Sequence, residues 1–177
     1  MNTEAVPEIA MNRVSASIGS LIFFAVAPGS IAGLLPWWLT RWEFRPAFFG
    51  IEGMRLFGLL LIAVGLLPLI DSFARFALHG LGTPAPIAPP QRLVVTGFYR
   101  YVRNPMYVGV VSAILGQALL FADTRLLWCA ALVWLAFHLF VILYEEPTLR
   151  GAFEADYGPF CANVPRWVPR LSPWTGA

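Results

Sequence analysis

The chain reads MYVGVVSAILGQALLFADTRLLWCAALVWLAFHLFVILY from Met106 to Tyr144, and this stretch decides its fold. Two uncharged apolar runs, Met106 to Ala122 and Leu126 to Tyr144, are separated only by the tripeptide Asp123 to Arg125. Runs of this length without charge are typical of membrane helices, and so short a connection makes the two helices an antiparallel hairpin. The segments before Met106 and after Tyr144 are therefore predicted to emerge at the same membrane face.

The composition of the whole chain supports a membrane location. Of 177 residues, 58% are hydrophobic and 12% are charged, about half the charged share of a soluble domain. All 12 basic residues are arginine, against 10 acidic residues, and the net charge of +2 gives no electrostatic basis for nucleic-acid binding. Cys129 and Cys161 form neither a disulfide framework nor a metal site. An ordinary soluble enzyme and a disulfide-framed secreted module are excluded.

Two further apolar runs precede the hairpin. Val14 to Thr40 is uncharged but carries Pro28-Gly29 near its middle, so it forms either one kinked span or a shorter span with an interfacial piece. Leu56 to Ile70 is short for a bilayer, so its amphipathic continuation to Leu78 is expected to help it cross. A signal peptide is the competing interpretation of the first run. We expect the run to be retained, because it is long, follows acidic residues and lacks a small-residue cleavage site.

These runs predict an all-α fold, a multi-pass membrane bundle of about four to five spans. We divide the chain into N-terminal transmembrane helices at 1–79 and a core at 80–177. The core contains a proline-rich connector, the hairpin at 105–145, and a C-terminal amphipathic helix and tail that are expected to close a pocket.

Arginine counts predict the orientation of a four-span arrangement, because the side with more basic residues faces the cytoplasm. Eight arginines fall on one side: Arg13, Arg75, Arg92, Arg100, Arg103, Arg150, Arg166 and Arg170. Four fall on the other: Arg41, Arg45, Arg55 and Arg125. The N-terminus, the middle loop and the C-terminal tail are therefore predicted to lie on the cytoplasmic side of a prokaryotic cytoplasmic membrane.

The segment after the hairpin is predicted to contain a short amphipathic helix. Pro147 disfavours α conformation at Glu146, so the fourth helix is expected to end or bend there. A new helix can start at Pro147, with Leu149, Phe153 and Tyr157 in one apolar stripe. Such a stripe suits a helix that lies on the membrane surface or covers a site.

Polar and aromatic residues gather just before the hairpin. Asn104-Pro105 is a strong helix-start signal, since the Asn side chain can accept from a backbone N–H while Pro takes the first helical position. The remaining N–H groups would favour an anion at the membrane surface. The alternative interpretation is an interfacial anchor, in which Tyr99, Tyr101 and Tyr107 form an aromatic belt and nearby arginines meet lipid phosphates.

Acidic residues close the second helix of the hairpin. Glu145-Glu146 could be a plain polar stop, but two acids at an anionic membrane surface are better used facing a cation. The hairpin is expected to place them beside Arg100, Arg103 and the tyrosines. His138 shares a helix face with Glu145, and we interpret it as a hydrogen-bonded interior histidine in preference to a catalyst.

The order and spacing of these motifs resemble the integral-membrane methyltransferases, which include the isoprenylcysteine carboxyl methyltransferases and the phospholipid N-methyltransferases. The likeness extends from Gln91 to Pro169. Its motifs are Gly-x-Tyr at 97–99, Arg-x-Pro-x-Tyr-x-Gly at 103–109, Glu-Glu-x-x-Leu at 145–149, Phe-x-x-x-Tyr at 153–157 and Val-Pro-x-x-x-Pro at 164–169. Each motif alone is weak, and their common order carries the resemblance.

The resemblance implies S-adenosylmethionine-dependent methyl transfer to a lipophilic carboxylate, amine or thiol that enters from the bilayer and reacts at the cytoplasmic face. The last two helices, the loop before them and the tail would enclose the cofactor. No metal is implied, and the catalytic residues stay open, with His138 and Arg166 as candidates. The implied cofactor-binding residues are Gln91, Arg92, Leu93, Val94, Tyr99, Arg103, Asn104, Pro105, Met106, Tyr107, Glu145 and Glu146.

Two positions depart from the family pattern. Asn104 stands where most relatives have His, so any proton role of that imidazole cannot operate here. Val141 stands where the eukaryotic prenylcysteine enzymes carry an Arg thought to hold the substrate. Another lipophilic oxygen, nitrogen or sulfur nucleophile is therefore as suitable an acceptor as a prenylcysteine carboxylate.

Two other functions are compatible with the same hairpin. Steroid 5α-reductase-like membrane enzymes share this topology and use NADPH, but they carry Asn and Glu where this chain has Met106 and Val110. A non-catalytic membrane scaffold is the second alternative, and it predicts no binding of S-adenosylhomocysteine.

Overall fold

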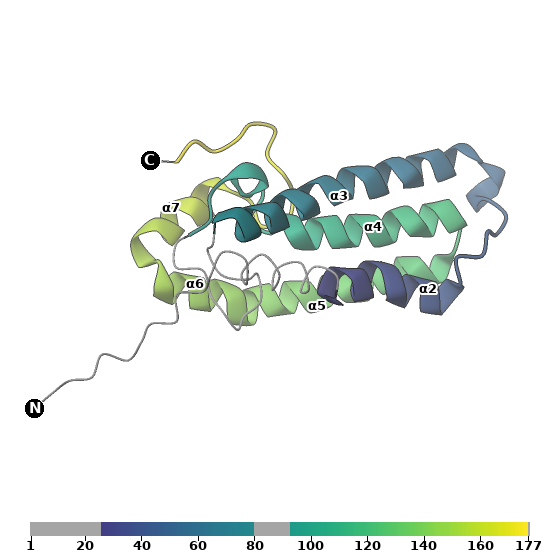
Figure 1. Cartoon of the computed structure of the whole chain (residues 1–177), viewed down its shortest axis with the longest axis horizontal. Helices are drawn as coiled ribbons and strands as arrows, with labels where there is room; N and C mark the ends of the chain where they lie inside the picture. The colour runs from purple at the N-terminus through teal and green to yellow at the C-terminus, as the bar shows by residue number, and fades with distance from the viewer. Residues whose placement is uncertain (1–25, 80–92, 177) are drawn as a thin grey trace, which may run out of the picture.

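A computed structural model describes residues 26–79 and 93–176 of the chain (Figure 1). These residues form helices and no strands, which confirms the all-α prediction. The predicted proline-rich connector, Gly80 to Gln91, lies outside them. The elements are η1 (Ser30–Leu34), α2 (Leu35–Thr40), η2 (Phe48–Gly50), α3 (Gly53–His79), η3 (Gly97–Arg100), α4 (Pro105–Phe121), α5 (Thr124–Phe140), η4 (Val141–Glu145), α6 (Glu146–Ala152) and α7 (Glu154–Asn163).

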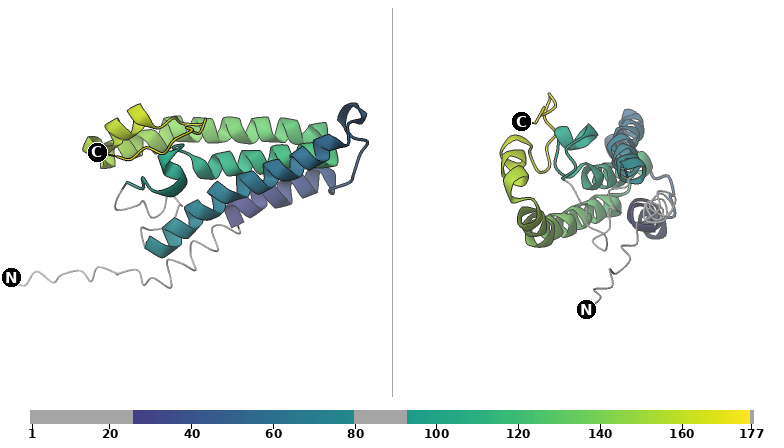
Figure 2. Two further views of the ribbon diagram at one scale, coloured as in Figure 1. Left: turned by 90° about the horizontal axis from the view of Figure 1, so that it is seen from above. Right: turned by 60° about the vertical axis from the view of Figure 1, so that its left-hand side comes forward.

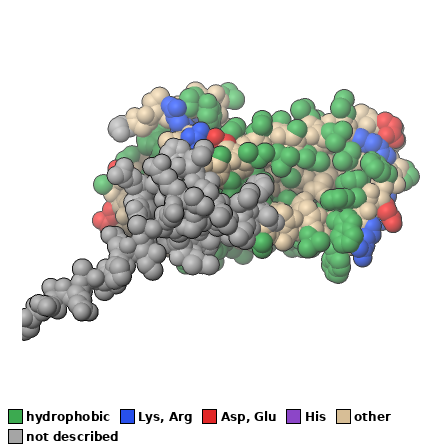
Figure 3. All heavy atoms as spheres, viewed as in Figure 1, with side chains coloured by type: hydrophobic (Ala, Val, Ile, Leu, Met, Phe, Trp, Pro, Cys, Tyr) green, Lys and Arg blue, Asp and Glu red, His purple; other side chains and the backbone are tan. Residues whose placement is uncertain are grey.

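The longest helices have the length and composition of membrane helices. Gly53–Arg75 and Thr124–Ala152 are each long and apolar enough to cross a bilayer, and α4 is apolar but shorter. Figure 3 shows hydrophobic side chains over the middle of the visible face and charged side chains toward its two ends. This distribution is that of a membrane protein. The number of four to five spans stays a prediction.

The described arginines gather at the two ends as the counts predicted. Arg55 donates to the carbonyl of Leu120 at 2.7 Å, and Arg45 pairs with Asp123 at 3.2 Å, so these residues surround the end of α4. Arg100 and Arg103 lie at the opposite end, where Figure 2 shows α6, α7 and the C-terminal tail. Arg13 and Arg92 lie outside the described residues, and the assignment of one end to the cytoplasm stays a prediction.

Glycines bring α3 and α4 into close antiparallel contact. Gly58 lies opposite Gly116 and Gly65 opposite Gly109, each pair seven residues from the next along its helix. A Cβ atom added at Gly116 would lie 2.6 Å from the Gly58 carbonyl oxygen. Small residues let membrane helices approach this closely. The contact positions α4, and with it the residues of its first turn, against α3.

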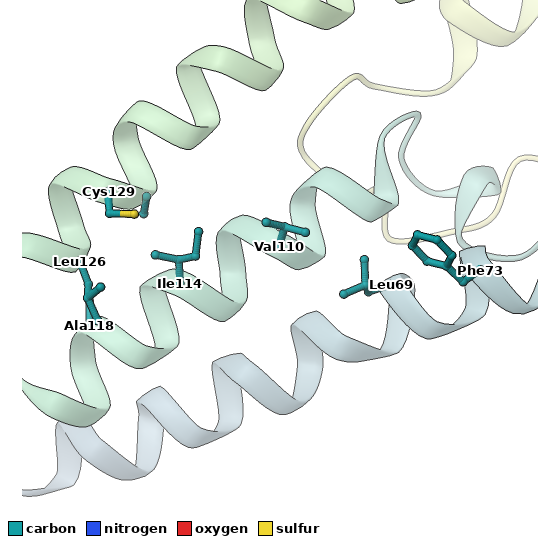
Figure 4. Packing of buried hydrophobic residues seen from close by; sticks show 8 residues of the cluster. Leu69, Phe73, Val110, Ile114, Ala118, Leu126 and Cys129 are labelled. Carbon is teal, nitrogen blue, oxygen red and sulfur yellow. The ribbon is translucent and has the colours of Figure 1, made fainter. Parts of the chain in front are cut away.

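The apolar core lies between α3, α4 and α5. Figure 4 shows Leu69 of α3, Ile114 and Ala118 of α4, and Leu126 of α5 in this layer, and all four are almost fully buried. Gln117, also buried, donates to the Ala32 carbonyl at 2.7 Å and so ties the first described helix to α4. The core therefore holds three helices and the end of the first apolar run in one bundle.

The hairpin forms as predicted, with an even shorter connection. Only Ala122 and Asp123 separate α4 from α5. Ala122 takes the left-handed conformation (φ 54°) and ends α4. The Asp123 carboxylate accepts from the Arg125 backbone N–H at 2.9 Å and caps α5.

The prediction that the fourth helix ends at Glu146 is wrong. Glu146 has helical φ and ψ of −63° and −44°, and helix continues from α5 through η4 and α6 to Ala152. The segment Val141–Glu145 is a π-helical turn, in which the Glu146 N–H donates to the Val141 carbonyl. This wider turn lets the helix absorb Pro147, which has no N–H and would crowd a regular turn.

The predicted single stripe at Leu149, Phe153 and Tyr157 is split between two helices. The chain breaks at Phe153 (φ −133°, ψ 45°), so Leu149 lies on α6 and Tyr157 on α7. All three nevertheless pack in one apolar cluster with Phe160 and Val164. Burial of these side chains, and not helical periodicity, brings them together.

The described part of the first apolar run is not broken at its proline. Residues 26–40 are helical throughout, and Gly29 has helical φ and ψ of −63° and −39°. Residues 1–25 lie outside the description, so the choice between one span and two stays open.

Candidate functional site

The hairpin brings Tyr107 and Glu145 together, as the sequence predicted. Tyr107 lies in the first turn of α4 and donates its hydroxyl to Glu145 Oε2 at 3.0 Å. The Tyr107 ring stacks on Phe137 of α5, with ring centroids 4.5 Å apart. The stacking fixes the Tyr107 ring so that its hydroxyl reaches the Glu145 carboxylate. This contact joins the two helices of the hairpin.

Tyr99 is buried beside this contact. It lies on η3, and the side chain of Ser72 from α3 hydrogen-bonds its hydroxyl. Burial, together with the charge of Glu145, raises the pKa of Tyr99 well above its usual value. Tyr99 is therefore a neutral phenol at physiological pH, able to offer or accept a hydrogen bond without ionising.

The turn that carries Tyr99 depends on Gly97 and Asp71. Gly97 has φ 57°, and an added Cβ atom would collide with the side chains of Arg75 and Asp71, so only glycine fits. Asp71 Oδ2 accepts from Arg75 Nε at 2.8 Å and from the Phe98 backbone N–H at 3.2 Å. These bonds attach the turn to the end of α3, and no local sequence pattern connects that helix end with the site.

Two arginines hold Glu146, the second acid of the pair. Arg166 donates Nε to Oε1 at 2.5 Å and Nη2 to Oε2 at 3.0 Å, and Arg103 Nη1 lies 3.1 Å from Oε1. The hydrogen bond to Glu146 raises the pKa of Arg166, so the guanidinium stays charged. The charge of Glu146 is therefore compensated within the protein.

Glu145 is arranged differently. Among residues 26–75 and 93–176 it has no basic partner within ion-pair distance, and its described hydrogen bond comes from Tyr107. It is half-buried, at the edge of the hairpin. A carboxylate in these surroundings is suited to a cationic ligand, since an unpaired charge is costly to bury.

The C-terminal tail is hydrogen-bonded along the segment that precedes α4. The backbone N–H of Arg103 donates to the Pro165 carbonyl, and that of Arg170 donates to the Tyr101 carbonyl, each at 2.9 Å. The Trp174 N–H donates to the Arg100 carbonyl at the same distance. The tail thus lies beside the residues that the resemblance assigned to a cofactor site.

Asn104 does not cap α4 with its side chain, so that part of the prediction is wrong. The helix begins at Pro105, as expected. The Asn104 amide instead donates to the Arg166 carbonyl at 3.1 Å, because the tail supplies a nearby acceptor. Asn104 therefore links the start of the hairpin to the tail.

His138 is hydrogen-bonded, as predicted. The Trp167 indole N–H donates to His138 Nδ1 at 3.2 Å, and Trp134 stacks on the imidazole with ring centroids 5.2 Å apart. Trp167 belongs to the tail, so this contact is another attachment of the tail to α5. A catalytic role for the ring stays untested.

The other predicted site residues do not gather at one place in the structure. Gln91 and Arg92 lie outside the described residues. Leu93 packs on the cluster around Tyr157, and Val94 belongs to no regular element. Met106 packs against the main core. Within the described part of the chain, no group of three or more His, Cys, Asp or Glu side chains is placed to hold a metal.

Comparison with known proteins adds one finding. A sequence model of a protein family, described as phospholipid methyltransferase, matches residues 54–156. The matched range covers more than half of the chain, from α3 into α7, and it includes Tyr99, Tyr107, Glu145 and Glu146. No curated protein and no solved structure matches the chain.

Proposed function

The chain belongs to the phospholipid methyltransferase family, and we propose that it transfers a methyl group from S-adenosylmethionine to a lipophilic acceptor at the cytoplasmic membrane face. Family membership makes the chain a membrane methyltransferase. The identity of the methyl donor, the class of acceptor and the membrane face at which they react are what we propose beyond this membership.

The unequal pairing of the two acids carries this proposal. Glu146 is held by Arg103 and Arg166, whereas Glu145 faces only the Tyr107 hydroxyl among the described residues. S-adenosylmethionine has a cationic sulfonium and an ammonium group, and the Glu145 carboxylate is suited to a cation of this kind. When bound, this donor supplies an electrophilic methyl group.

The side chains around Glu145 have supporting roles in the proposal. Tyr107 orients the carboxylate by its hydrogen bond, and Tyr99 stays neutral in a buried position. The tail, through its bonds to Tyr101, Arg103 and Asn104, would cover the cofactor and exclude water. Positioning of donor and acceptor supplies about 7 to 11 kcal/mol of a transfer barrier. The reaction needs no nucleophilic side chain of the protein, since the acceptor is itself the nucleophile.

The acceptor is proposed to reach the site from the bilayer. The family description favours a phospholipid among the lipophilic amines, carboxylates and thiols that the residues allow. Val141, which is buried in the π-helical turn, offers no charge to a prenylcysteine carboxylate. A screen with radiolabelled S-adenosylmethionine and membrane lipid extract would identify which lipid class receives the methyl group.

Titration of the full chain in detergent tests the proposed donor. We expect calorimetry to show saturable binding of S-adenosylhomocysteine and none of NADPH. Binding of NADPH alone would replace the proposal with a reductase. Binding of neither ligand, by protein that unfolds cooperatively on heating, would favour a non-catalytic scaffold.

A further inference from the structure

The loop that joins α2 to α3 presents large apolar side chains at the end of the molecule opposite α6 and α7 (Figure 1). Its residues are 41–52. Phe44 is 67% exposed, Phe49 is 92% exposed and Ile51 is 56% exposed. Apolar side chains this exposed within one short loop indicate a surface that meets another apolar surface.

Hydrogen bonds tie this loop to the end of α4. The Arg45 backbone N–H donates to the Phe121 carbonyl at 3.1 Å, and Arg55 Nη2 of α3 donates to the Arg45 carbonyl at 2.7 Å. The same guanidinium donates to the Leu120 carbonyl at 2.7 Å. Ala47, near the middle of the loop, is buried. The exposed side chains are therefore carried on an ordered backbone.

The backbone at Phe49 adopts a conformation that a bulky residue rarely takes. Phe49 has φ 55° and ψ 19°, and Gly50 follows with φ 70°. The Gly50 N–H donates to the Ala47 carbonyl at 2.9 Å, and the Ile51 N–H donates to the Phe48 carbonyl at 3.1 Å, so the turn is hydrogen-bonded in this form. Strained conformations persist where the surrounding structure holds them, and they concentrate at functional positions. The turn thus holds the Phe49 ring away from the rest of the protein.

Neighbouring features indicate the membrane as the partner of this surface. The candidate span Gly53–Arg75 begins directly after the loop. Trp38 on α2 and Leu56 on α3 are also more than half exposed, so apolar surface continues from the loop onto both helices. The Arg41 guanidinium lies over the Trp37 ring, 4.4 Å from its centroid. Aromatic side chains together with long basic ones are typical of the boundary between membrane and water.

We propose that the loop 41–52 lies in the interfacial layer of the membrane at this end of the bundle, with Phe49 as its apolar anchor. The loop also holds four charged side chains, which favour water. An interfacial position suits both kinds of side chain, because the charged ends reach the headgroup layer while the aromatic rings enter the acyl boundary. This anchoring needs no particular headgroup and no residue around Glu145, so it does not depend on the proposed methyl transfer.

Spin labels on the full chain test this placement. A nitroxide is attached to Phe49→Cys in a Cys161→Ser background, since the other native thiol, Cys129, is buried. The protein is reconstituted in phosphatidylcholine vesicles, and the accessibility of the label to oxygen is divided by its accessibility to a water-soluble nickel chelate. We expect this ratio to be severalfold higher than for a label at Glu43→Cys, an exposed position in the same loop. Equal ratios at the two positions would overturn the proposal.

Vesicle composition and dilution identify the partner. The ratio at Phe49→Cys should be the same when the vesicles also contain phosphatidylglycerol, because a phenyl ring does not distinguish headgroups. A high ratio only with the anionic lipid would mean headgroup recognition and would overturn the apolar anchor. Broadening of the spectrum that disappears on dilution with unlabelled protein would place a second copy of the chain on the loop, which would also overturn the proposal.

A further pair of variants tests Phe49 as the anchor. A label at Ile51→Cys reports on the loop while Phe49 is in place. Adding Phe49→Gly should lower the ratio at this label, since glycine keeps the left-handed backbone and removes only the ring. The melting temperature should not fall, which separates loss of the anchor from unfolding of the loop. An unchanged ratio at Ile51→Cys would show that Phe49 does not anchor the loop, and the proposal would be wrong.

Discussion

Each end of the helix bundle holds an acidic side chain with little solvent exposure. The two acids differ in whether arginine side chains pair with them. At one end, Asp123 is fully buried, caps α5, and pairs with Arg45 at 3.2 Å and Arg125 at 2.7 Å. At the other end, Glu145 accepts from the Tyr107 hydroxyl and has no arginine partner among the described residues. A compensated carboxylate stabilises a turn, whereas one without a cation remains available to a ligand.

The adjacent acid Glu146 shows that proximity to arginine alone does not decide this outcome. Glu145 and Glu146 are neighbours in the chain, yet Arg103 and Arg166 both bind Glu146. Successive residues of a helix point in different directions, so only one of two adjacent acids can meet a given partner. The comparison between Asp123 and Glu145 therefore predicts different consequences when each is removed.

The largest effect is expected from Glu145→Ala. Loss of the carboxylate should weaken S-adenosylhomocysteine binding by about 2 to 5 kcal/mol, as for removal of one partner from a desolvated charged contact. Calorimetry on the detergent-solubilised protein measures this change. Glu154→Ala, at an exposed acid on α7, is the control and should bind like the wild type. If Glu145→Ala and the wild type bind S-adenosylhomocysteine with equal affinity, Glu145 is not a ligand-binding acid and does not differ from Asp123 in this respect.

Asp123→Ala should have the opposite profile. We expect a loss of about 1 to 2 kcal/mol in stability, because a helix cap and two partly exposed ion pairs disappear. Thermal unfolding measures the loss, and S-adenosylhomocysteine affinity should be unchanged. Glu43→Ala, an exposed acid in the same region, serves as the control. Weakened ligand binding in Asp123→Ala would show that the two ends are not independent.

The stabilisation by Asp123 should also depend on pH. Its hydrogen bond to Arg125 holds the pKa of Asp123 below the ordinary value of 3.8, with Arg45 contributing. Because the folded pKa is below the unfolded one, the contribution is complete above the ordinary pKa and is lost as pH falls through the folded pKa. The difference in melting temperature between wild type and Asp123→Ala should therefore be constant near neutral pH and shrink as the pH falls below the ordinary pKa of 3.8. A difference that grows on acidification would contradict this account.

Tyr107→Phe should have a smaller effect than Glu145→Ala. The substitution keeps the ring that stacks on Phe137 and removes only the hydroxyl that orients Glu145. We expect S-adenosylhomocysteine binding to weaken by about 1 kcal/mol. Tyr144→Phe, at an exposed tyrosine on the same helical hairpin, is the matched control. A loss as large as that of Glu145→Ala would mean that Tyr107 itself contacts the ligand.

The smallest effect on ligand binding is expected from His138→Ala. Its partners are Trp134 and Trp167, so the substitution removes a contact between α5 and the tail. We expect a change in S-adenosylhomocysteine affinity of less than about 0.5 kcal/mol. Methyl transfer and binding should be measured together, because lost turnover with intact affinity would make this ring catalytic and our interpretation wrong.

The meeting of Tyr107 and Glu145 could be predicted because it follows from topology. Two apolar runs with a tripeptide between them have only one compact arrangement, so residues at the outer ends of the hairpin must meet. The start of α4 at Pro105 was predictable for a similarly local reason. The π-helical turn at Val141–Glu145 was not, because the proline rule describes a preference that packing can override.

The partners of individual polar groups were much less predictable. Asn104 bonds the tail in place of its own helix, and Asp71 from α3 holds the turn that carries Tyr99. Both bonds join segments that are far apart in the sequence. Asn104 had a local alternative in its own helix, and Asp71 keeps a local bond to Arg75 beside the distant one. Whether a distant bond forms depends on where the distant segment lies.

The amino-acid sequence by itself determined the helical class, the hairpin and the end of the bundle at which tyrosines and acids gather, because hydrophobic length and short connections leave few alternatives. The tertiary structure alone decided that Arg103 and Arg166 compensate Glu146, while Glu145 meets no basic side chain within residues 26–75 and 93–176. The physical reason is that charge compensation acts over a few ångströms. It depends on side-chain directions and on the path of the tail, which no local pattern specifies.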